Sequence, residues 1–174
     1  MNRIAALAGA LALWAYGAQG FAQTPPDPAI VTLEVLDSAG LPVGQYQHYR
    51  HAMTTKVARI VTLVPLLPRE GNSEVLEFAS RGSLFFTTPD CTGQAYIRSG
   101  QEFGTRPSVS METARGRWRL YVASSPTFAQ VTMASELIAP RSCQPMFRPR
   151  PDFFSPALDP VNLENKFAGP FTLR

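Results

Sequence analysis

Short runs in which apolar and polar residues alternate recur along most of the chain. In Ile30–Leu36 and again in Arg117–Ala123, apolar side chains occupy every second position. This period of two is typical of a half-buried β-strand, because successive side chains of a strand point to opposite faces of the sheet. Further β-type runs, each bounded by turn-forming residues, are Leu41–Gln45, Val57–Leu67, Val75–Phe78, Leu84–Thr88, Gln94–Arg98 and Phe128–Ala134. Strands at a spacing of roughly 10 residues predict a mainly β fold, either a small antiparallel sandwich or a barrel.

Prolines limit where several of these segments can lie. Pro42 and Pro65 lack the backbone N–H that a central ladder needs, so we expect each to lie at an edge or to interrupt its ladder. From Pro140 to Pro170 the chain holds seven prolines. We therefore expect residues 140–174 to form a Pro-rich C-terminal strap without an interior strand. A polyproline-type recognition peptide at Arg148–Pro151 is the alternative.

Helical periodicity is weak after the first 22 residues. The best candidate for a helix is Val161–Phe167, for which Asp159 provides an N-cap, Pro160 a first helical residue and Gly169 a stop. We expect at most one short helix, at this position.

The N-terminus follows the pattern of a secretory signal peptide. Arg3 supplies a positive charge, Ile4–Tyr16 is an unbroken apolar run of 13 residues, and small residues lead up to Ala22. These are the three parts of such a signal. We predict cleavage between Ala22 and Gln23, with a cut after Gly20 or an uncleaved N-terminal anchor as alternatives. The protein would then be exported, to the periplasm or to the extracellular medium.

This interpretation divides the chain into four parts: residues 1–22 as the signal, 23–29 as an extended lead-in, 30–139 as the β core, and 140–174 as the strap. Removing 22 of the 174 residues leaves 152, which is enough for one domain with its own core. A membrane-spanning helix needs about 20 apolar residues. No run of that length occurs, so we expect no stable membrane span in the mature chain.

The chain holds two cysteines, Cys91 and Cys143, and 143 − 91 gives a separation of 52 positions. In an oxidising compartment an even number of cysteines predicts a disulfide, and here a single pairing is possible. Closing a loop of this length stabilises the fold by up to about 4 kcal/mol. A redox-active pair is the alternative, but such pairs usually have a C-x-x-C spacing, which is absent here.

Charge argues against nucleic acid as a partner. The net charge is +3, and it falls to +2 if Arg3 is removed with the leader. The arginines are scattered, and Lys56 is the one lysine among the first 165 residues, whereas a nucleic-acid interface needs a dense basic patch. We also expect no cofactor, since Gly100–Gly104 lacks the lysine and the following helix of a phosphate-binding loop.

The two histidines, His48 and His51, form the candidate polar site. Their spacing places both on one side of a helical turn but on opposite faces of a strand. A metal site needs three or four ligands, and the nearest carboxylate in the sequence is Asp37, so we expect no metal. A serine hydrolase needs a nucleophile, a base and an orienting acid. The chain has no G-x-S-x-G motif, so we assign no catalytic residue.

An Asp-Cys-Thr-Gly turn, followed by a small, an aromatic and an aliphatic residue, spans Asp90–Ile97. This segment resembles one in uncharacterised exported bacterial proteins, which often begin with a Val-x-Asp-x-x-Gly strand and turn and end near Pro-Phe. The counterparts here are Val35–Gly40 and Gly169–Phe171. The resemblance covers scattered parts of the chain and implies no activity, and His48 and His51 have no counterpart in it.

Together these observations favour an exported, non-enzymatic β domain that binds or scaffolds an envelope or extracellular ligand or protein. The alternative is a small secreted hydrolase that uses His48 or His51 beside a serine or a carboxylate. A third hypothesis is a subunit of an assembly, which an exposed strand edge or a large apolar patch would indicate.

Overall fold

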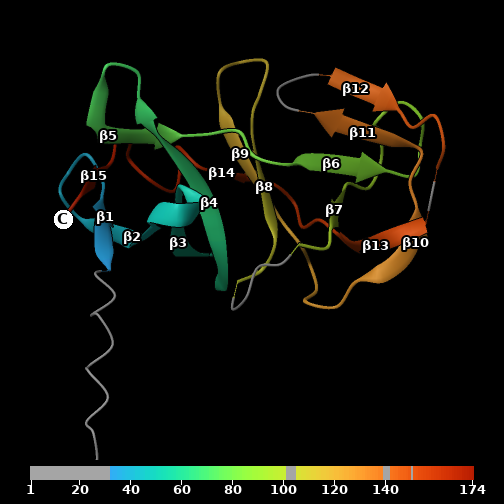
Figure 1. Cartoon of the computed structure of the whole chain (residues 1–174), viewed down its shortest axis with the longest axis horizontal. Helices are drawn as coiled ribbons and strands as arrows, with labels where there is room; N and C mark the ends of the chain where they lie inside the picture. The colour runs from blue at the N-terminus through green and yellow to red at the C-terminus, as the bar shows by residue number, and fades with distance from the viewer. Residues whose placement is uncertain (1–31, 101–104, 139–141, 150) are drawn as a thin grey trace, which may run out of the picture. The chain divides into compact units, whose positions relative to one another are not determined.

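Figure 1 shows the computed structural model of the chain, which describes residues 32–100, 105–138, 142–149 and 151–174. The strands of this part form three antiparallel sheets, and a single 3-10 turn, His48–Arg50, lies among them. The prediction of a mainly β fold is confirmed. Among the described residues, no helix has the length and apolar character needed to cross a membrane.

The first sheet closes almost completely into a barrel. Its strands, in spatial order, are β15 (Thr172–Leu173), β1 (Leu33–Leu36), β2 (Pro42–Gln47), β3 (Ala52–Val57), β4 (Ile60–Arg69) and β5 (Asn72–Phe78). Leu76 of β5 and Phe171, which precedes β15, exchange two backbone hydrogen bonds of 2.8 and 2.9 Å. The C-terminal segment therefore joins the two ends of a sheet that is otherwise built from the N-terminal half of the chain.

Two further sheets follow in the sequence. The strands of the second, in spatial order, are β10 (Ala129–Thr132), β13 (Pro151–Pro156), β7 (Tyr96–Arg98), β6 (Ser83–Phe86), β11 (Ser135–Ile138) and β12 (Ser142–Pro145). The strands of the third and smallest are β14 (Val161–Asn162), β9 (Trp118–Val122) and β8 (Ser108–Glu112).

The small third sheet contributes to two hydrophobic cores, because both of its faces carry apolar side chains. Leu120 and Val122 of β9 belong to the cluster that fills the barrel. Val109 of β8 pairs with Tyr121, so it projects from the opposite face. Val109 and Met111 accordingly belong to a second cluster, which packs against strands of the second sheet. Because side chains alternate between the two faces, β8 and β9 contribute apolar side chains to both cores.

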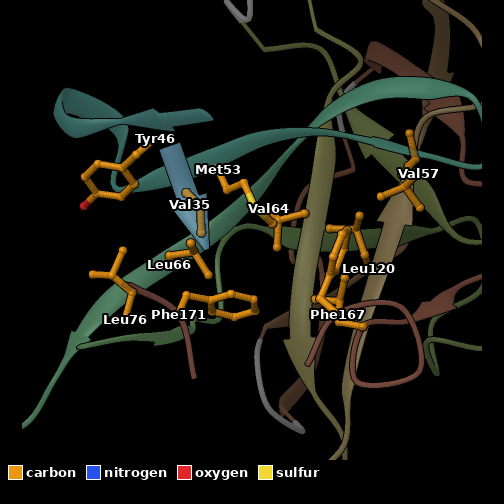
Figure 2. Close-up of a cluster of buried hydrophobic side chains, with 12 residues drawn as sticks. Val35, Tyr46, Met53, Val57, Val64, Leu66, Leu76, Leu120, Phe167 and Phe171 are labelled. Atoms are coloured by element: carbon orange, nitrogen blue, oxygen red, sulfur yellow. The ribbon is translucent and has the colours of Figure 1, made fainter. Parts of the chain in front are cut away.

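The barrel core is mainly apolar and buried. Figure 2 shows Phe171 beneath Leu66 and Val35, and Phe167 belongs to the same cluster as Leu120. Phe171, Leu66 and Val35 each have 0% of their surface exposed. Side chains from the C-terminal segment therefore complete a core whose other members come largely from β1 to β5.

Pro65 marks the place where β4 changes its partner, as the sequence led us to expect. Its pairing with Ala52 is the last position of the β3 ladder. The β5 ladder begins one residue later, at the pair Leu66 and Phe78. Pro65 therefore lies at a break between two ladders, where its missing N–H is tolerated.

The expectation that residues 140–174 hold no interior strand is wrong. β13 pairs with β10 on one side and with β7 on the other. Its two prolines, Pro151 and Pro156, occupy the ends of the strand. The four residues between them retain their N–H groups, so the strand can pair on both edges.

The best candidate for a helix, Val161–Phe167, is not helical, which agrees with the expectation of at most one short helix. Residues 161–162 form β14 instead, and Oδ1 of Asn162 accepts a hydrogen bond of 2.9 Å from the backbone N–H of Glu164. The one turn that follows ends where the N–H of Phe167 donates to the carbonyl oxygen of Leu163 at 2.8 Å. Asn162 therefore performs the capping that the sequence assigned to Asp159.

Candidate functional site

The structure confirms the predicted disulfide between Cys91 and Cys143, whose Cα atoms are 5.9 Å apart. Cys91 lies in the turn after β6 and has a positive φ of 56°. Cys143 lies on β12, which forms one edge of the second sheet. Both sulfur atoms are bonded, so this pair offers neither a thiolate nucleophile nor a thiolate metal ligand. The predicted cleavage positions, Ala22 and Gln23, lie outside the described residues.

Hydrogen bonds fix the disulfide-bearing turn to β11. The buried hydroxyl of Ser135 donates to the carbonyl oxygen of Thr88 at 2.6 Å and accepts the N–H of Cys91 at 3.2 Å. Asp90 accepts a hydrogen bond of 2.7 Å from the hydroxyl of Thr92. That bond, followed by one from Thr88, holds the pKa of Asp90 below its usual value. These polar groups bond to one another, which is typical of a structural anchor.

His48 and His51 come together at the tip of the β2–β3 hairpin. His48 begins the 3-10 turn and His51 follows it, with their ring centroids 5.8 Å apart. The hydroxyl of Tyr46 lies 3.3 Å from Nδ1 of His51. Burial raises the pKa of the Tyr46 phenol above its ordinary value. Both imidazoles are exposed to solvent.

Within the part of the chain that the structure describes, this histidine pair is not given the partners that catalysis or metal binding requires. Across the described residues, no group of three His, Cys, Asp or Glu side chains is placed to hold a metal ion. The contacts described for the two imidazoles are with Tyr46 and with each other, and they include neither a serine hydroxyl nor a carboxylate. The geometry therefore gives no support to hydrolysis at His48 or His51.

A pocket of about 460 Å³ lies where one end of the barrel meets β9 and the C-terminal segment. Its volume is within the range of small-molecule sites. Four stretches of chain contribute to it: the β4–β5 hairpin, the start of β9, the turn after β14, and the segment that closes the barrel. The lining residues are Arg69, Glu77, Phe78, Trp118, Glu164 and residues 167–171.

Aromatic rings form one part of the pocket wall. The ring of Phe78 lies 6.2 Å from that of Trp118 and 5.0 Å from that of Phe171, measured between centroids. Phe171 is fully buried, whereas Phe78 and Trp118 keep part of their surface exposed. The buried ring of Phe171 therefore supports that of Phe78, which in turn lies beside Trp118, and both of these outer rings remain accessible to a ligand.

Charged side chains form another part of the wall. Nε of Arg69 donates to Oε1 of Glu77 at 2.6 Å, and Nη2 of the same guanidinium lies 2.5 Å from that oxygen. Glu164 accepts the backbone N–H of Trp118 through Oε1 at 3.2 Å. The pocket thus combines the Arg69–Glu77 ion pair, whose charges offset each other, with the carboxylate of Glu164. That carboxylate is hydrogen-bonded to the backbone of Trp118.

The sequence patterns did not predict this pocket. Its lining residues are spread between positions 69 and 171, and no local motif connects them. One signal was available, because residues 69–73 are turn-forming and predict a hairpin, and the hairpin of β4 and β5 brings Arg69 close to Glu77. The contribution of Glu164 depends on the turn capped by Asn162, which the sequence did not indicate.

Comparisons with known proteins do not assign this chain to a family. No family model matches it, and neither a curated protein nor a solved structure is significantly similar to it. The function must therefore be inferred from the geometry of the chain's own residues.

Proposed function

We propose that this chain is an exported, non-enzymatic binding module, and that the pocket between Phe78, Trp118 and Glu164 is its ligand site. The observation that carries the proposal is the meeting of accessible aromatic rings and fixed charged groups in one pocket. Apolar walls with a few placed polar groups are what small-molecule sites use for affinity and orientation. The histidine pair, by contrast, is exposed and has no catalytic partner among its described contacts.

Export is supported by the three-part leader pattern and by the disulfide, which suits an oxidising compartment. The intact mass of the protein from fractionated cells tests this part of the proposal. We expect a chain that begins at Gln23 and gains the mass of two hydrogens on reduction. A mass that begins at Met1, or two free thiols before reduction, would overturn the export argument.

Trp118 offers a direct reporter for the ligand site. The chain holds two tryptophans, Trp14 and Trp118. Trp14 lies in the predicted leader, and in a full chain that keeps the leader the substitution Trp14→Phe makes indole emission report on the pocket alone. We expect a saturable change in this emission, together with a higher melting temperature, on titration with one of four probes: glucose, glycine, acetate or choline.

A matched pair of variants distinguishes the pocket from the rest of the surface. Ala168→Phe adds a ring to a residue that lines the pocket, whereas Ala129→Phe adds the same ring at an exposed position of β10. We expect the first to weaken binding and the second to leave it unchanged. The proposal fails if no probe gives a saturable response at concentrations that fill a site of millimolar Kd. It also fails if Ala168→Phe binds as well as the parent chain.

A further inference from the structure

The charge balance of the pocket selects among ligand classes. One arginine and two glutamates, Arg69, Glu77 and Glu164, line it, so the lining carries a net charge of −1. Arg69 and Glu77 are bonded to each other at 2.5 and 2.6 Å. Their charges are therefore largely compensated, and Glu164 contributes the net negative charge.

The accessible aromatic rings of the pocket also favour a positively charged ligand. The face of an aromatic ring carries partial negative charge and attracts a cation, most strongly in tryptophan. Trp118 and Phe78 lie 6.2 Å apart, between centroids, with their planes inclined at 47°. A group that contacts both rings thus meets two surfaces that favour positive charge.

Glu164 is held in place before any ligand arrives. Its Oε1 accepts the backbone N–H of Trp118 at 3.2 Å, and its own N–H donates to Oδ1 of Asn162 at 2.9 Å. The carboxylate is therefore anchored to the strand that carries the indole ring. A site whose groups are already ordered loses less conformational entropy when it binds a ligand.

These features disfavour two of the obvious ligand classes. A carboxylate or a phosphate would be repelled by Glu164 and by the ring faces, while Arg69 is already engaged with Glu77. A neutral saccharide would use the rings and hydrogen bonds but gain nothing from the net charge. A cation with apolar substituents matches both the carboxylate and the rings.

We infer that the pocket binds a substituted ammonium group, with the nitrogen beside Glu164 and the alkyl substituents against Trp118 and Phe78. This inference rests on the proposed function of the pocket and specifies its ligand class. The same chemistry is presented by a free alkylammonium compound and by the choline headgroup of a lipid, so the experiment includes both sources.

The test compares choline with its uncharged carbon analogue, 3,3-dimethylbutan-1-ol (called dimethylbutanol below). In this analogue a carbon atom replaces the nitrogen, so the charge is lost while the shape is kept. Both are titrated into the full chain carrying Trp14→Phe, and Trp118 emission is recorded. We expect choline to bind roughly tenfold more tightly, which is the scale of a cation–π contact combined with a partly exposed ion pair. A parallel titration uses phosphatidylcholine vesicles in place of free choline.

Glu164→Gln removes the charge but keeps an oxygen that can accept the N–H of Trp118. We expect it to weaken choline binding by roughly fivefold, without changing the affinity for dimethylbutanol. Glu136→Gln, on β11 and outside this pocket, removes one carboxylate from the chain as the matched control. We expect it to bind choline as the parent chain does, which excludes a general effect of net charge.

Each result has a defined meaning. Binding of vesicles that depends on Glu164 assigns the lipid headgroup as the source, and binding of free choline without vesicle binding assigns a small amine. Equal affinities for choline and dimethylbutanol, or binding of glucose in place of choline, overturn the ammonium class but leave the pocket as a ligand site. No response to any probe overturns the ammonium class and the proposed function together.

Discussion

Replacing Phe171 by alanine tests whether the C-terminal segment holds the barrel closed. The side chain is 0% exposed, and its ring centroid lies 5.0 Å from that of Phe78. Removing a buried phenylalanine costs about 3–5 kcal/mol, and an edge-to-face aromatic pair such as Phe78–Phe171 contributes about 0.5–1.5 kcal/mol beyond its buried area. We therefore expect Phe171→Ala to lower the free energy of unfolding by about 4–5 kcal/mol.

This loss is large compared with the total stability of a single domain, which is about 5–15 kcal/mol. At about 2–4 °C for each kcal/mol in a chain of this size, the melting temperature should fall by roughly 8–20 °C. Urea unfolding, followed by Trp118 fluorescence and far-UV circular dichroism with the disulfide kept oxidised, measures the change. The two signals should change together if the barrel unfolds as one unit.

Two further substitutions show whether burial is the cause. Phe147 has 101% of its reference surface exposed, so Phe147→Ala should change the free energy of unfolding by less than about 0.5 kcal/mol. Phe171→Leu keeps an apolar side chain in the core and should cost less than about 2 kcal/mol. If Phe171→Ala unfolds within about 1 kcal/mol of the parent chain, the closing segment is not part of the cooperative core and the reasoning is refuted.

Three other substitutions test separate parts of the structure by the same urea assay. Cys143→Ser should lower stability by about 2–4 kcal/mol, and reduction of the parent chain should give a similar loss. Gly44→Ala would place a Cβ 2.7 Å from a backbone carbonyl oxygen, so it should cost about 1–3 kcal/mol. The pKa of Asp152 is lowered by the N–H of Phe153 and by the Arg98 guanidinium. Its stabilising effect should be present above its ordinary pKa and disappear as the pH falls through the lowered value. Asp152→Asn should therefore be less stable than the parent chain at pH 7 and equally stable in strong acid. Equal stability at pH 7 would show that the Asp152 carboxylate does not stabilise the fold.

Local patterns were sufficient for the class of fold and for the disulfide. The alternation in Arg117–Ala123 is the signature of β9, because a strand with one buried face must repeat with a period of two. Pro65 indicated a break in a ladder, since the missing N–H acts on its own residue. Cys91 and Cys143 had one possible pairing, so no long-range information was needed.

Features that depend on context could not be predicted in this way. The prolines of β13 suggested a segment without an interior strand, yet they lie at its two ends, and where a strand ends is decided by its neighbours. Asp159 and Asn162 are both good capping residues. The choice between them depends on the pairing of residues 161–162 with β9. The pocket is even harder to predict from local patterns, because it forms only when residues distant in the chain close the barrel.

Phe171 contributes both to the closure of the barrel and to the wall of the pocket. Phe171 bonds to the backbone of Leu76 and supports the ring of Phe78, whereas Glu164 lies exposed outside the core. Phe171→Ala should therefore lower both stability and affinity, while Glu164→Gln should lower affinity alone. A ligand that binds only the closed barrel stabilises it by about 2.7 kcal/mol at a hundredfold excess over its Kd. Choline at a hundredfold excess over the Kd of the parent chain should raise the parent's urea midpoint. The same concentration should raise the midpoint of Glu164→Gln by less. Equal protection of both chains would show that choline stabilises the fold from somewhere other than this pocket.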